Sequence, residues 1–317
     1  MARFSVSGAA TSGFGVIGRE PVAVLTWGVL ILLVVVLPYV GMFWAVVPDF
    51  VAIFKTAASS PGTHDPDPEM MSRIMQMQSK MMLLNLVYWL GGTLMKAVLA
   101  AAVFRIVLEP DQKGFAFLRL GAQELWLALV FLVIGVLAYL VCLVAMLAVG
   151  ILAGLAYVFG AMASPEAGVA SCILVAVLAG LVATGAVVWA MLRLSMAGPM
   201  SFSERKFLLF EAWPLTRGQA WPLLGMVLLL GLIVIALETV VYGVAGVGFL
   251  AFGSQLIPMF QGLANQPPQA WMRALWPFAA GVAVVGSLLA GPAMALIFAP
   301  WATAYRDLRA SAQAEAA

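Results

Sequence analysis

Long runs of apolar residues, separated by short polar connections, dominate this chain. We place these runs at 22–47, 81–106, 124–160, 168–194, 220–250 and 277–303. A helix of about 20 apolar residues crosses the hydrocarbon core of a bilayer. The pattern therefore predicts an all-α, polytopic membrane protein with six transmembrane helices.

The middle of the chain allows two interpretations. Between Glu124 and Arg193 the only charged residue is Glu166, and this length has room for either two or three spans. Two spans make the third of the six long for a bilayer, so that it must tilt or protrude. Hydropathy alone does not decide between the two counts.

A recurring pattern favours two spans. Similar segments precede the first, third and fifth runs: 14–20 (FGVIGRE), 117–124 (FLRLGAQE) and 213–221 (WPLTRGQAW). An arginine signature follows the second, fourth and sixth runs, at Arg105, Arg193 and Arg306. Tandem copies of one supersecondary unit produce such a period. We predict a single membrane domain, 1–317, with repeated hairpin units at about 4–109, 114–198 and 201–310, and a periplasmic loop with a helix at about 48–80.

The composition agrees with a membrane protein. The chain is 64% hydrophobic and 9% charged, whereas soluble domains carry about 25% charged residues. The formal net charge is +2, and no basic stripe predicts nucleic-acid binding. Cys142 and Cys172 fall inside apolar runs, which favours small buried residues over a disulfide. The run from Val22 is interpreted as a retained first span rather than a cleaved signal peptide.

The distribution of basic residues predicts the topology. With both termini in the cytoplasm, the inner segments hold Arg3, Arg19, Arg105, Lys113, Arg119, Arg193, Arg205, Lys206, Arg217, Arg306 and Arg309. The outer segments hold Lys55, Arg73, Lys80 and Arg273. Cytoplasmic loops carry an excess of Lys and Arg, so this orientation is predicted.

Two ionisable residues, Lys96 and Glu238, lie inside predicted spans. Such residues are functional candidates by default, for example in a transport pathway. The alternative is structural: Lys96 extends to the inner interface and Glu238 lies near the outer one. The signature arginines Arg105, Arg193 and Arg306 are candidates for binding lipid headgroups, and their alternative role is topological anchoring.

The segment 201–213 (SFSERKFLLFEAW) is predicted to form an interfacial helix. Its apolar side is made by Phe202, Phe207, Leu209, Phe210 and Trp213. Ser201 and Glu204 fit a capping box at its start. Glycines in the spans are expected to permit close helix approach; they are Gly150, Gly154, Gly180, Gly185, Gly243, Gly246, Gly286 and Gly291.

Two segments outside the spans hold possible metal ligands. The loop 59–69 contains His64, Asp65, Asp67 and Glu69, but its prolines favour a stiff solvated loop. The following helix carries methionines that could hold Cu(I), although Met70, Ile74, Met77 and Met81 have the spacing of a packing face. We therefore predict no metal and no cofactor.

No enzymatic motif is present. His64 is the only histidine, so a histidine-based triad or a multi-histidine metal site cannot form within the chain. No glycine-rich loop followed by Lys-Ser/Thr predicts nucleotide binding. The sequence is interpreted as that of a non-enzyme.

Segments 114–129 (GFAFLRLGAQELWLAL) and 193–224 (RLSMAGPMSFSERKFLLFEAWPLTRGQAWPLL) resemble a bacterial family. It comprises the membrane domain of some glycerophosphodiester phosphodiesterases and related stand-alone inner-membrane proteins. The resemblance covers nearly the whole chain in layout and implies six spans in the bacterial inner membrane, with an association to lipid or envelope metabolism. It implies no phosphodiesterase activity, because the soluble catalytic domain is missing.

Together these observations predict a non-enzymatic inner-membrane protein that acts through lipid or protein contacts, as a scaffold, regulator or accessory subunit. Its expected partners are membrane lipids and a membrane protein or a second copy of the chain. The alternative function is a transporter or channel-like permease that uses Lys96 and Glu238.

Overall fold

The computed structural model confirms the all-α fold. It describes residues 4–42, 68–112, 114–263 and 268–316, together with residues 46 and 53. The protein is 89% helical, without strands in these residues. Six described helices are long and apolar enough to cross a membrane: Pro21–Met42, Met71–Leu108, Phe115–Ala161, Pro165–Glu204, Ala220–Gly248 and Trp276–Ala314.

The spans are connected by shorter elements. In chain order the elements are α1 (Val6–Arg19), α2 (Pro21–Ile31), the π-helix η1 (Leu32–Val36), α4 (Pro68–Leu108), the 3-10 helix η2 (Phe115–Phe117), α5 (Ala122–Ala161), α6 (Pro165–Leu194), α7 (Ala197–Glu204), α8 (Ala212–Leu215), α9 (Ala220–Leu263) and α10 (Pro268–Ala316). Each hairpin follows a short segment, in the predicted order. The equivalence of the three units stays a prediction.

Two spans, not three, occupy the middle of the chain, as predicted. Helix α5 has 40 residues and is about 60 Å long at 1.5 Å per residue. The turn to α6 ends at Ser164, whose hydroxyl accepts a hydrogen bond from the backbone N–H of Ala167 at 3.1 Å. Pro165 then occupies the first helical position, where its fixed φ favours helix formation.

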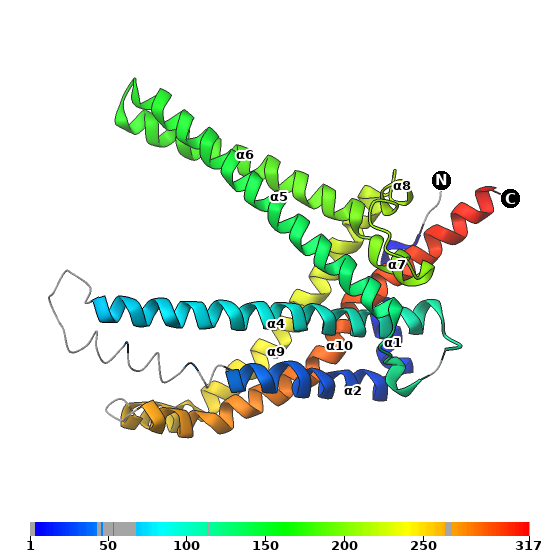
Figure 1. Ribbon diagram of the computed structural model, residues 1–317, viewed down its shortest axis with the longest axis horizontal. Coiled ribbons are helices and arrows are strands. Elements are labelled where there is room, and N and C mark those ends of the chain that lie inside the picture. The colour runs from blue at the N-terminus through cyan, green and yellow to red at the C-terminus, as the bar shows by residue number, and fades with distance from the viewer. Residues whose placement is uncertain are drawn as a thin grey trace.

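The helices converge at one end of the molecule, which we call the hub. The hub consists of α1, η2, α7 and α8 with the adjoining ends of α4, α5 and α10, and the hairpins diverge from it (Figure 1). An alanine-rich stretch of α4 makes the hub compact, because small side chains allow helices to approach closely. Ala97, Ala100, Ala101 and Phe104 pack with Leu127, Phe202 and Ala302 in one buried cluster.

Glycines permit close helix crossings, but mostly not those predicted. A Cβ atom on Gly28 would lie 2.7 Å from the Ser287 carbonyl oxygen, and one on Gly291 would lie 2.2 Å from the Val24 carbonyl oxygen. Helices α2 and α10 therefore meet at these two glycines. The prediction is confirmed at Gly291 and wrong at the others in the predicted set, whose Cβ positions have no neighbour within 4 Å (Gly150, Gly154, Gly180, Gly185, Gly243, Gly246 and Gly286).

The single interfacial helix predicted over 201–213 is wrong. Helix α7 ends at Glu204, and Arg205 has a left-handed backbone with φ 56°, a conformation that cannot continue a helix. The capping box is wrong too, because Ser201 lies inside α7. Its hydroxyl donates to the Leu208 carbonyl at 2.9 Å and accepts from the Leu208 N–H at 3.0 Å.

The cysteines are free, in agreement with the expected absence of a disulfide. Cys142 is exposed on α5 and Cys172 is half-buried on α6. The expectation that both are buried is therefore wrong. The long α5–α6 hairpin diverges from the other spans (Figure 1).

Candidate functional site

A buried ion pair lies at the centre of the hub. The Arg105 guanidinium donates to the Glu124 carboxylate and to the Phe117 carbonyl. The other carboxylate oxygen accepts from the Gly121 N–H at 3.0 Å, which closes the start of α5. Arg105 is 0% exposed and Glu124 is 2% exposed. The pair therefore joins the end of α4 to the start of α5.

This pairing assigns Arg105 a structural role. Its guanidinium also lies 5.5 Å from the centre of the Phe202 ring, a cation–π distance. Trp27 supports the same loop by donating from Nε1 to the Ala116 carbonyl at 2.9 Å. Arg105 has no exposed surface that a lipid phosphate could contact.

Arg193 lies between two tryptophans. Its guanidinium carbon is 5.4 Å from the centre of the Trp189 ring and 5.8 Å from that of Trp213. The rings meet edge to face, with centroids 5.2 Å apart. Nε and Nη1 of Arg193 are buried without a hydrogen-bond partner, so the ring faces provide their attractive contact. Arg193 thereby joins the end of α6 to α8.

The third signature arginine has a different environment. Arg306 is exposed on α10 and lies 3.3 Å from the carboxylate of its neighbour Asp307. Arg309, one turn later, contacts α7 instead: it donates to Ser203 at 2.8 Å and pairs with Glu204 at 2.8 Å. Arg306 is thus the signature arginine that is most open to a headgroup.

Lys96 lines a cavity within the spans. The cavity has a volume of about 250 Å³ and lies between α2, η1, α4 and α10. It is lined by Ile31, Val35, Tyr88, Trp89, Gly92, Thr93, Met95, Lys96, Leu99, Ala290 and Met294. Lys96 makes no hydrogen bond or ion pair with the residues that the structure describes. The site therefore combines one unpaired cation with a mostly apolar wall.

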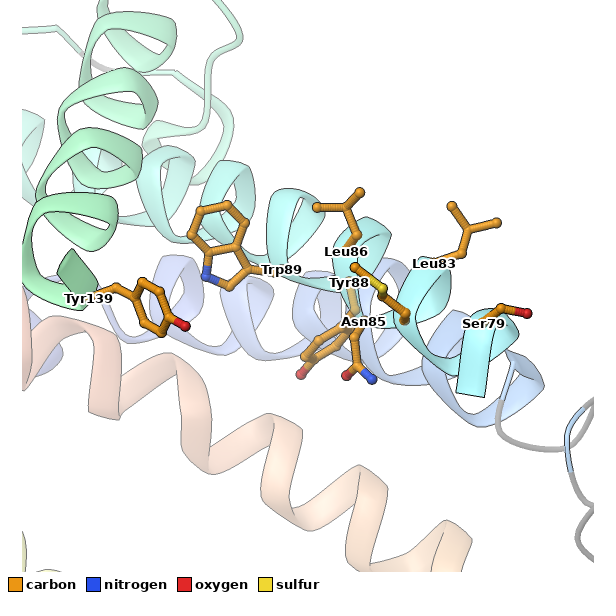
Figure 2. A pocket seen from close by; sticks show the side chains of 8 residues that line it. Ser79, Leu83, Asn85, Leu86, Tyr88, Trp89 and Tyr139 are labelled. Atoms are coloured by element: carbon orange, nitrogen blue, oxygen red, sulfur yellow. The ribbon is translucent and has the colours of Figure 1, made fainter. Parts of the chain in front are cut away.

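A larger apolar cleft, with a volume of about 1020 Å³, adjoins the Lys96 cavity and shares Tyr88 and Trp89 with it. Figure 2 shows Tyr139 of α5 extending toward α4 on the side where Trp89 projects. The Trp89 ring lies 3.8 Å from the Cβ position of Gly135 on α5. The shared residues place the two spaces next to each other along α4.

Glu238 lies apart from this cavity. It is exposed on α9 and has no ion pair or hydrogen bond within the described part of the chain. At 1.5 Å per residue, Glu238 is roughly 27 Å along α9 from Ala220, whereas Lys96 is roughly 18 Å along α4 from Leu108. The structure does not bring the two intramembrane charges into contact.

The predicted interfacial aromatics have unequal environments. Phe202 is fully buried against Phe104, with ring centroids 5.8 Å apart. Phe207 and Trp213 are about one-third exposed, and Phe210 is 67% exposed. Three of the four predicted aromatic residues therefore reach the surface of the hub, whereas Leu209, the fifth residue of the predicted apolar side, is buried.

The possible metal ligands His64, Asp65 and Asp67 lie outside the described residues, as do the side chains of Glu69 and Met70. On α4, Ile74, Met77 and Met81 are half-buried, whereas Met71, Met75 and Met82 are exposed. This alternation agrees with the packing face predicted from the spacing.

Sequence reasoning missed the partners of the arginines. Glu124 begins a span just after the polar connection that follows Arg105. Opposite charges at the two ends of one short connection are a signal for a buried pair. Comparison of the chain with protein-family models, curated proteins and solved structures finds no match, so the site is interpreted from its own geometry.

Proposed function

We propose that this chain is a non-enzymatic protein of the bacterial cytoplasmic membrane that acts through contacts with lipids or with other membrane proteins. The observation that carries this proposal is the exposure of its spans. None of the most apolar stretch of Pro165–Glu204 is buried inside the protein, and only 11% is buried in Phe115–Ala161 and in Ala220–Gly248. Acyl chains or foreign helices must cover these faces in a bilayer.

The hub supports the proposed orientation. Arg19, Arg119 and Arg217 lie at the hub end of the spans, whereas Arg73 and Lys80 lie at the opposite end of α4. An excess of basic residues favours the cytoplasmic side. The hub, with the exposed Phe210 and Arg306, would then lie at the inner leaflet, where anionic headgroups attract arginine.

Glu238 supports a protein partner or a second copy of the chain. An exposed carboxylate within an apolar span is unfavourable unless a cation or hydrogen-bond donor meets it. Among the described residues, no cation or hydrogen-bond donor meets the Glu238 carboxylate. A basic or polar residue on a foreign helix would complete this site.

The alternative function, a permease that uses Lys96 and Glu238, has one favourable observation, the cavity beside Lys96. Lys96 and Glu238 lie apart in the structure, which favours the first proposal. In proteoliposomes, Lys96→Gln combined with Glu238→Gln should leave the flux of tested solutes unchanged. A selective loss of flux would support the permease instead.

The proposal is tested by extracting the full chain from native membranes into polymer-bounded discs. Mass spectrometry should find a lipid enriched above the bulk membrane composition, or one protein that co-purifies reproducibly. A matched disc population that holds an unrelated six-span protein is the control. Lipids identical to the bulk membrane, with no reproducible protein, would contradict the proposal.

A further inference from the structure

We propose that the Lys96 cavity binds an amphiphile with one long acyl chain and a carboxylate headgroup, such as a free fatty acid. This inference rests on the proposed contact with lipids and names the class of lipid. The carboxylate pairs with the Lys96 ammonium, and the chain lies along α4 in the apolar cleft beside Trp89 and Tyr88.

Lys96 is exposed on α4 and lines the cavity, and the direction of its side chain favours the cavity over the hub interface. Side chains on a helix tilt toward its N-terminus, and the N-terminus of α4 lies away from the hub. The Lys96 side chain is therefore directed toward the level of Thr93, Gly92 and Trp89, which line the same cavity. This direction opposes extension to the hub interface.

The need for an anion follows from the missing partner. An unpaired lysine within a membrane helix is energetically unfavourable. No described carboxylate pairs with Lys96, and the Thr93 hydroxyl donates to the Trp89 carbonyl of its own helix at 2.8 Å. The ammonium, the Tyr88 hydroxyl and the Trp89 indole N–H are the polar groups left to face a ligand.

A carboxylate suits this site better than a phosphate monoester. The cavity offers one positive charge, which a carboxylate balances, whereas a phosphate monoester carries about −1.5 to −2 at neutral pH. The larger cleft is lined by Met82, Leu83, Leu86, Tyr139 and the aromatic residues shared with the cavity, and also by Ser79 and Asn85, whose side chains donate to carbonyls of their own helix. Its apolar wall fits an acyl chain, and its position between diverging spans allows entry from the bilayer.

The backbone beside the cavity provides room for the headgroup. Gly92 lines the cavity, and its Cβ position has no neighbour within 4 Å. The facing wall includes Val35 in the π-helix η1; π-helical turns are frequent at functional sites. Gly91 is equally free of neighbours but does not line the cavity, which makes it a matched control for changes at Gly92.

The experiment uses the full chain in lipid nanodiscs and a palmitic acid that carries a photoactivatable diazirine. We expect saturable labelling in peptides that contain 82–99, displaced by unlabelled palmitate. Hexadecanol should compete about tenfold more weakly, because it lacks the charge. Acetate should not compete, because it lacks the chain. Equal competition by hexadecanol, competition by acetate, or stronger competition by a single-chain phosphate monoester would overturn the carboxylate assignment.

Variants test the site itself. Lys96→Gln should weaken palmitate binding about tenfold, and Lys96→Arg should retain it. Gly92→Leu should abolish saturable labelling by filling the cavity, while Gly91→Leu binds like the original chain. Size-exclusion profiles and thermal unfolding identify variants that do not fold. Labelling unchanged in folded Gly92→Leu or Lys96→Gln protein would overturn the inference. If native discs still retain a lipid or protein partner in that case, the proposed function stands and only the site is wrong.

Discussion

Single residues in the hub connect one hairpin to the next. Arg105 at the end of α4 pairs with Glu124 at the start of α5, and Arg193 at the end of α6 contacts Trp213 at the start of α8. Each of these two arginines therefore belongs to the end of one predicted unit and contacts the beginning of the next. The recurrence of arginine in the sequence has a structural reason at both places.

Replacing one member of the buried pair should strongly destabilise the protein. Glu124→Gln leaves the Arg105 charge buried without its counter-ion, and loss of one partner of such a pair costs about 3–5 kcal/mol. We expect a lower thermal unfolding temperature in detergent. Arg119→Gln is the control, since Arg119 is exposed and, among the described residues, its side chain bonds only to Gln112 at 3.2 Å.

A double variant tests whether the charges of the pair, rather than its other hydrogen bonds, determine the stability. Arg105→Leu combined with Glu124→Leu removes both charges and should be more stable than Glu124→Gln alone, because apolar replacement of a whole buried pair is often tolerated. Measured stability equal to that of the single variant would mean that the bonds to Phe117 and Gly121 dominate instead.

The tryptophan contacts of Arg193 lead to a second prediction for single residues. Trp213→Leu keeps an apolar side chain but removes the ring face, and cation–π contacts are worth about 0.5–2 kcal/mol. We expect a small loss of stability, measured by thermal unfolding. Trp221→Leu is the matched control, because Trp221 is 82% exposed. Equal effects of the two substitutions would contradict the assigned contact.

Helices cross closely where a glycine leaves no side chain between them. Gly28 and Gly291 lie at the α2–α10 crossing, and Gly13 allows α1 to approach Leu296 of α10. The sequence contains many further glycines in apolar runs, but their presence does not tell which face of a helix meets a neighbour. Only the packing of α10 between α1, α2 and α4 distinguishes these positions.

Substitutions should distinguish a glycine at a close helix crossing from a glycine that has no neighbour. Gly28→Leu places side-chain atoms where the backbone at Ser287 and Leu288 already lies, so the helices must move apart. We expect a loss of about 1–3 kcal/mol, the usual cost of overpacking, together with more rapid proteolysis. Gly180→Leu, with no neighbour within 4 Å, should leave both measurements nearly unchanged. A similar loss at the two positions would contradict the close crossing.

At the scale of the whole molecule, the hub and the diverging hairpins have different physical characters. The hub is held by buried charges, cation–π contacts and an alanine-rich core, whereas the far parts of α5, α6 and α9 expose apolar side chains. Such a protein is closely packed at the hub and open to lipid or a partner elsewhere. This division supports the proposed function.

The proposed orientation is tested by thiol labelling. In a Cys142→Ser, Cys172→Ser background, His64→Cys should react with a membrane-impermeant reagent from the periplasmic side. Arg217→Cys should react only after the inner face is opened, because the α8–α9 turn belongs to the hub. Labelling of both positions from one side would contradict the six-span topology.

The sequence by itself determined the all-α fold, the six spans and the presence of two intramembrane charges. These properties depend on local composition, since burial of apolar surface in lipid requires long hydrogen-bonded helices. The start of α6 is also set locally, because the Ser164 cap and Pro165 act within one turn.

Only the tertiary structure decided which residues meet. Arg105 and Glu124 are 19 residues apart, and their pairing depends on the path of η2. The left-handed backbone at Arg205 interrupts the predicted interfacial helix, because Ser201 and Leu208 form a hydrogen-bonded loop. The Lys96 cavity likewise requires α2, α4 and α10 together. Contacts between distant segments depend on packing in three dimensions, which the local pattern of apolar and polar residues does not encode.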